Sequence, residues 1–81
     1  MILKEGSLLR NNSPLNSIWK QLEWDSDSSR YIMMDLYHSE KVPVFAIFIE
    51  FIDKKYDLIK IFYGNSIYYS FAGYWDLVDN I

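Results

Sequence analysis

The stretch that decides the fold is residues 44–72, which read VFAIFIEFIDKKYDLIKIFYGNSIYYSFA. It is rich in Ile, Phe and Tyr, which are enriched in β-strands. Gly64-Asn65, between two such runs, predicts a two-residue hairpin turn, and Lys54-Lys55 predicts a second tight turn. Links this short favour antiparallel neighbours, because parallel strands need a long crossover. We therefore predict three consecutive antiparallel strands, over residues 44–52, 57–63 and 66–72.

The chain before this stretch predicts one more strand, over residues 30–38, and one helix. Ser13 is a good N-cap, and Pro14 suits the first helical position. The residues at the spacing of one helical face are Leu15, Ile18, Trp19 and Leu22. We predict an α+β fold, in which a four-stranded antiparallel β-meander carries one short helix, over residues 14–24, packed on one face.

The two ends of the chain are less determined by pattern. Residues 1–9 are a candidate fifth strand, and residues 74–81 form either a short helix or an irregular cover. A length of 81 residues leaves room for one domain, so we expect residues 1–81 to form a single small unit.

Two-residue turns fix the register of the sheet and divide its residues between two faces. The predicted core face carries Phe45, Ile47, Ile49, Phe51, Leu58, Phe62, Ile67, Tyr69 and Phe71, together with Lys60. The second face carries Phe48, Ile59, Ile61, Tyr63 and Tyr68 beside Glu50 and Asp57. Those charges make full burial of the second face costly, yet such apolar patches mediate interaction. Its cover stays open between a flap from either chain end, a second copy and another protein.

Composition excludes several classes of site. The chain has no Cys and one His, His38, so a disulfide framework, a thiolate metal site and a multi-histidine cluster are excluded. No convergent set of polar groups indicates catalysis, and we expect no enzyme activity, no metal and no cofactor. Basic residues are scattered and the net charge is −3, which disfavours nucleic acid as a partner. Without a signal-peptide pattern or a long apolar run, we expect a cytoplasmic protein and no membrane contact.

Two segments, 22–27 and 73–79, mix large aromatic rings with carboxylates. Rings of this kind supply contact area at interfaces, and acids steer basic partners. Each segment has an alternative interpretation: Trp24 is equally the last core contact of the predicted helix, and the tail is a flap over the sheet. The predicted partner-binding residues are Trp24, Asp25, Asp27, Phe48, Ile61, Tyr68, Trp75 and Asp76.

These features favour a small, acidic, non-enzymatic inhibitor or immunity-type protein. It would bind one protein partner, such as a toxin, a nuclease or a defence component, and occlude a basic site on it. A short, acidic, cysteine-free and aromatic-rich chain is typical of small bacterial immunity proteins, antitoxins and phage counter-defence inhibitors. This is an analogy with a class of proteins, and no sequence motif supports it. The alternative is a self-associating structural or accessory protein that uses the second sheet face as a homodimer interface.

Overall fold

Antiparallel pairing joins seven strands into one sheet in the computed structural model, which describes residues 3–39 and 41–78. The strands are β1 (Leu8–Asn11), β2 (Trp19–Asp25), β3 (Arg30–Leu36), β4 (Val44–Asp53), β5 (Leu58–Tyr63), β6 (Ser66–Phe71) and β7 (Asp76–Leu77). Two 3-10 turns, η1 (Lys54–Tyr56) and η2 (Ala72–Tyr74), complete the elements. The described residues contain no α-helix, so the predicted α+β class is wrong and the fold is all-β.

The predicted helix over residues 14–24 is instead a turn followed by β2. Asn16, at φ 63°, adopts the left-handed conformation just after Pro14, which is incompatible with a continuing helix. β2 then pairs with β3 along its whole length. A helix of about three turns is marginal without tertiary docking, whereas strand pairing satisfies the backbone groups directly. Within the described ranges, no helix is long and apolar enough to cross a membrane.

The four predicted strands all exist, and the turn at Gly64-Asn65 is confirmed. Gly64 and Asn65 both have positive φ, 56° and 64°, as a type I′ hairpin turn requires. The predicted pairing across this turn is also confirmed, with Phe62 opposite Ile67 and Leu58 opposite Phe71. This hairpin is therefore a local consequence of its sequence.

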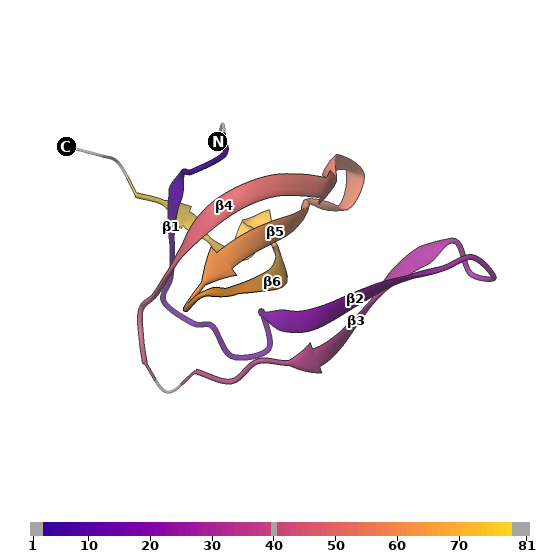
Figure 1. Ribbon diagram of the computed structural model, residues 1–81, viewed down its shortest axis with the longest axis horizontal. Helices are drawn as coiled ribbons and strands as arrows, with labels where there is room; N and C mark the ends of the chain where they lie inside the picture. Colours follow the sequence, from indigo (N-terminus) through magenta and orange to yellow (C-terminus); the bar gives the residue numbers. More distant parts are fainter. Residues whose placement is uncertain (1–2, 40, 79–81) are drawn as a thin grey trace.

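The two-residue turn predicted at Lys54-Lys55 is wrong. The chain makes the longer turn η1, in which the Asp53 carboxylate accepts a hydrogen bond from the Lys55 backbone N–H at 3.0 Å. Asp53 therefore lies opposite Leu58, and two register shifts in β4 follow. They restore the predicted pair Ile47 and Phe62 further along but displace the pairs predicted for Ile49 and Phe51. Because bulges bend and twist a strand, β4 curves over β5 (Figure 1).

The core lies on the second face, whose cover the sequence analysis left open, and the face predicted as the core is wrong. Leu9 and Trp75, from the two chain ends, belong to the core cluster on this second face. The buried core residues are Leu9, Ile18, Val44, Ala46, Phe48, Ile59, Ile61, Ala72 and Trp75. On the predicted core face, by contrast, Phe45, Phe62 and Ile67 are 47%, 40% and 42% exposed. No helix of residues 3–39 or 41–78 covers that face, and the sheet curls toward the opposite one.

The carboxylates of Glu50 and Asp57, which were expected to oppose burial of this face, do not lie on it. Local irregularities in β4 and η1 place both side chains elsewhere. Past the first register shift Glu50 lies opposite Lys60, and the two side chains pair at 3.3 Å on the outer face. Asp57 sits in the turn after η1 at φ 55° and is exposed. The inner face is therefore apolar enough to bury completely.

A buried chain of hydrogen bonds ties the chain segments together over the core. The Trp75 indole N–H donates to the Ser70 hydroxyl at 2.8 Å, and Ser70 donates to the Ser17 carbonyl. The Asn11 amide donates to the Ser17 hydroxyl at 2.9 Å, which in turn donates to the Pro14 carbonyl at 2.8 Å. Buried polar groups with satisfied partners specify one arrangement. These hydrogen bonds therefore fix the position of Trp75 over the core.

The order of strands, β3-β2-β6-β5-β4-β1-β7, differs from a simple meander. Among the described strands, β2 and β3 are neighbours in both sequence and space, and so are β4, β5 and β6. The candidate strand near the N-terminus exists as β1, which pairs with β4 and β7. The predicted tail element is η2 followed by β7, while residues 79–81 lie outside the described residues. β3 is displaced to the outer edge because β2 takes the place beside β6.

Candidate functional site

The β2–β3 hairpin projects from the body of the molecule (Figure 1). Within the described residues, β2 pairs with β6 at one position alone, Trp19 opposite Tyr69, and then leaves the body. The described chain consequently extends over 45 × 28 × 20 Å. A hairpin held at its base presents its tip and its edges to other molecules.

The tip of the hairpin is held by the Asp25 side chain. Its carboxylate accepts hydrogen bonds from the Ser28 hydroxyl at 2.6 Å and from the Asp27 backbone N–H at 3.1 Å. The bond from Ser28, above all, lowers the pKa of Asp25, although burial acts in the opposite direction. Asp25 therefore keeps its negative charge at neutral pH.

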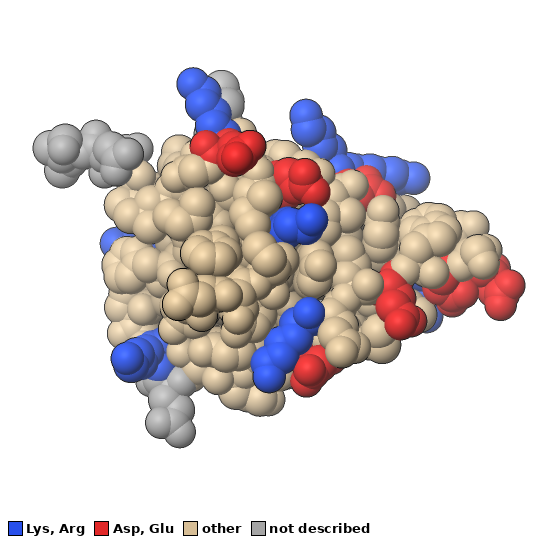
Figure 2. Space-filling model, viewed as in Figure 1, with Lys and Arg blue, Asp and Glu red and all other residues tan. Residues whose placement is uncertain are grey.

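An exposed aromatic pair stands beside this acidic turn. Trp24 is 54% exposed and meets Tyr31 of the neighbouring strand edge to face, with ring centroids 4.9 Å apart. Acidic side chains gather around the projecting end (Figure 2). The tip thus combines a large ring with carboxylates, the combination that anchors and steers protein contacts.

A groove of about 160 Å³ lies where the hairpin leans toward the body. It is lined by Arg30, Tyr31, Met33, Tyr56, Leu58 and Phe71. Tyr56, at the rim, is 52% exposed, while Leu58 is buried at its base. The walls are largely apolar, so the groove suits one apolar side chain of a partner rather than a polar substrate.

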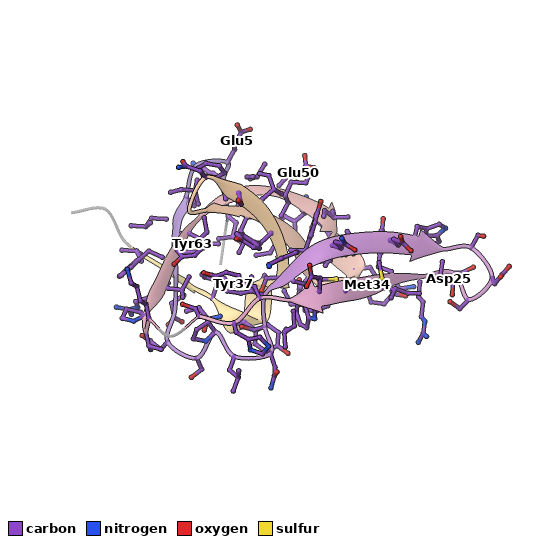
Figure 3. The ribbon with its side chains drawn as sticks, turned by 60° about the horizontal axis from the view of Figure 1, so that its bottom comes forward. Glu5, Asp25, Met34, Tyr37, Glu50 and Tyr63 are labelled. Carbon is purple, nitrogen blue, oxygen red and sulfur yellow. The ribbon has the colours of Figure 1, made fainter. Side chains whose placement is uncertain are left out.

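A second aromatic cluster, formed by Tyr37, Tyr63 and Tyr68, lies inside the curve of the sheet. The ring centroids of Tyr37 are 5.9 Å from Tyr63 and 4.9 Å from Tyr68, and Figure 3 shows Tyr37 and Tyr63 close together. Burial is the main cause that raises the pKa of Tyr37, and its hydrogen bond with Tyr63 adds to the effect. All three rings pack beside the core, so the cluster acts as structural packing.

The raised pKa of Tyr37 predicts a loss of stability at alkaline pH. Above the ordinary tyrosine pKa of about 10, the unfolded chain releases the Tyr37 proton while the folded chain keeps it. The unfolded state then binds fewer protons, so the free energy of unfolding falls as pH rises. Urea denaturation between pH 9 and 11 should show this fall, and Tyr37→Phe should make it shallower. An equally steep fall in the variant would contradict this assignment.

The predicted partner-binding residues do not form one surface. Trp24, Asp25 and Asp27 lie together at the hairpin tip. Phe48, Ile61 and Trp75 are at most 3% exposed, so their side chains offer nothing to a partner or to a second copy in this fold. The remaining two are separated, with Tyr68 in the tyrosine cluster and Asp76 on β7, 4.0 Å from Arg10.

The groove residues were not among the predicted binding residues. Finding them needed β2 to be recognised as a strand, because only then does Trp24 lie opposite Tyr31. The acidic turn at residues 25–29, flanked by aromatic residues, was the available signal of a hairpin. The helix-like spacing of Leu15, Ile18, Trp19 and Leu22 concealed the strand that precedes this turn. His38 is exposed, and the described residues hold no group of three His, Cys, Asp or Glu side chains that could bind a metal.

Comparison of the chain with protein-family models, with curated proteins and with solved structures gives no match. A proposal about function therefore rests on the projecting hairpin and its groove.

Proposed function

We propose that this protein is a non-enzymatic inhibitor or immunity-type protein that occludes a basic site on one protein partner, with the β2–β3 hairpin as the inserted element. The observation that carries the proposal is the tip, where Trp24 is 54% exposed beside the carboxylates of Asp25 and Asp27. A narrow projecting element reaches into a cleft that a flat surface does not enter. Aromatic residues of this kind dominate binding energies when a partner desolvates them.

The charge of the hairpin supports a basic partner. Residues 19–36 carry four acidic side chains, Glu23, Asp25, Asp27 and Asp35, against the two basic ones, Lys20 and Arg30, a net charge of −2 within a chain whose total is −3. Such a concentration of charge speeds association with a positive surface. Occlusion then blocks the partner's site by bulk and by charge together.

Trp24→Ala tests the aromatic anchor. The partner is first recovered from a lysate of the native host with the purified wild-type protein as bait, and its affinity is then measured by calorimetry. Loss of a central aromatic anchor costs about 2 kcal/mol or more, so we expect the dissociation constant to rise about 30-fold. Phe45→Ala is the matched control, because Phe45 is 47% exposed on β4, away from the tip. Equal losses in the two variants would contradict the proposal.

Asp27→Lys tests electrostatic steering. Its side chain, unlike that of Asp25, accepts none of the hydrogen bonds found in the tip turn of the described chain, so the turn should survive the substitution. We expect the association rate to fall by about threefold or more at low salt and the difference to vanish in 1 M salt, where charges are screened within about 3 Å. Asp76→Lys makes the same charge change on β7, at the far edge of the sheet. Equal slowing by both variants would exclude the tip as the steering element.

A further inference from the structure

β3 forms an open edge of the sheet, and the backbone groups that face outward can be assigned. β3 is the terminal strand in the order, and the Tyr37 backbone N–H donates to the Ile18 carbonyl at 2.8 Å. Pairs in an antiparallel ladder alternate between hydrogen-bonded and non-hydrogen-bonded. The left-handed backbone at Asp35 interrupts this ladder, and Lys20 and Asp35 do not pair. Asp25 and Arg30 close the four-residue turn as a hydrogen-bonded pair, and alternation from there makes the N–H and C=O groups of Tyr31 and Met33 point away from β2.

The open edge of β3 lacks the protection that sheet edges usually have. Natural edges carry charges, prolines or bulges that prevent further pairing. The centre of β3 reads Ile32-Met33-Met34, whereas β2 carries Lys20, Gln21 and Glu23 along its own length. The other sheet edge, β7, is two residues long. Left-handed backbone at Asp35, φ 58°, ends the regular part of β3 but leaves residues 30–34 open.

Charge decides what fits this edge. A second copy of the chain would bring another hairpin of net charge −2 alongside the first, and like charges across a strand pair are destabilising. An extended segment with basic side chains meets the opposite sign. The groove lies along the same strand, since Arg30, Tyr31 and Met33 of β3 line it. Figure 3 shows Met34 partway along the hairpin and Asp25 toward its projecting end.

We propose that an extended basic segment of the protein partner adds to the sheet as a strand beside β3 and places one apolar side chain in the groove. This inference rests on the proposed function and states how the partner docks. Backbone hydrogen bonds to Tyr31 and Met33 supply the pairing, and the acidic side chains of the hairpin select a positive segment. Strand addition of this kind takes its affinity from the main chain and its specificity from side-chain pockets.

Met33→Pro tests the strand addition directly. Proline removes the outward-facing N–H of Met33 and is tolerated at sheet edges, so β2 and β3 keep their own ladder. We expect the affinity for the partner to fall about 10-fold or more, while Met33→Ala, which shortens the same side chain but keeps the N–H, lowers it less. The melting temperature of each variant checks that the fold persists. Wild-type affinity in a folded Met33→Pro variant, or an equal loss in Met33→Ala, would overturn the proposal.

A peptide probe provides a measurement that needs no proline variant. The probe is a blocked seven-residue peptide that alternates Lys and Val, and its counterpart alternates Glu and Val. We expect the Lys peptide to slow amide hydrogen exchange at Tyr31 and Met33 in the wild-type protein and the Glu peptide to leave it unchanged. Equal protection by both peptides, protection elsewhere, or protection that rises with protein concentration in the absence of peptide would overturn the proposal; the last outcome would identify a second copy as the occupant.

The two levels of the proposal fail in different ways. If Trp24→Ala weakens partner binding and Met33→Pro does not, the hairpin is the binding element but strand addition is wrong. If neither substitution changes the affinity for the partner, the proposed function itself is wrong. If both weaken it and Met33→Ala weakens it less than Met33→Pro does, the docking mode stands.

Discussion

Ile61→Asp is expected to prevent folding altogether. Ile61 is 0% exposed and belongs to the core cluster with Phe48 and Trp75. An unpaired carboxylate at such a position costs more than about 5 kcal/mol. A chain of 81 residues has a total stability of only about 4–12 kcal/mol. Circular dichroism should show no cooperative thermal transition in the variant.

The neighbouring substitution Phe62→Asp is the matched control for this result. Phe62 follows Ile61 directly but lies on the outer face of β5 and is 40% exposed. The substitution loses part of an apolar contact, about 1–2 kcal/mol, and places the carboxylate in water, so the variant should fold. The reverse outcome, with Ile61→Asp folded and Phe62→Asp unfolded, would restore the core face predicted from the sequence and contradict the structure.

Trp75→Ala is expected to have the second largest effect on stability. The side chain is 3% exposed and closes the core, and its indole N–H donates to the buried Ser70 hydroxyl. Truncating a buried Trp costs about 3–5 kcal/mol. In a domain of this size each kcal/mol lowers the melting temperature by about 4–8 °C. Differential scanning calorimetry should therefore show a fall of more than about 12 °C.

Trp24→Ala is the control for this prediction. Trp24 is 54% exposed and contacts Tyr31 at the hairpin tip. Its removal should change the melting temperature by a few degrees while weakening partner binding. The two tryptophans thus separate the stability of the fold from the function of the tip. Similar thermal losses in both variants would mean that the hairpin tip is part of the cooperative core.

The assignment of faces explains why the predicted binding residues divide as they do. Phe48 and Ile61 were assigned to a binding face on the assumption that Glu50 shared it. The register shift in β4 places Glu50 opposite Lys60 instead. Trp24, Asp25 and Asp27 occupy the tip because their local sequence forms a turn whichever element precedes it. The positions that depend on local turn chemistry could be predicted from the sequence, and those that depend on a long register could not.

The sequence by itself determined the strands over residues 44–72 and the turn between β5 and β6. Strand composition and the Gly64-Asn65 pair act over a few residues, and their effects do not depend on distant contacts. The acidic composition of the segment that follows Leu22 was equally visible. These features are local, and local propensity was sufficient for them.

Three features depend on the tertiary structure alone. They are the strand conformation of residues 19–25, the choice of which sheet face is buried, and the position of β3 at the edge. The spacing of Leu15, Ile18 and Trp19 suits a helix, but pairing with β3 outweighs that weak preference. Two single-residue register shifts in β4 turned Glu50 outward and let Leu9, Ile18 and Trp75 enclose the inner face. Side chains alternate with a period of two along a strand, so one shift reverses the faces of the residues after it until the second shift restores them. The open edge of β3 exists because β2 occupies the place beside β6.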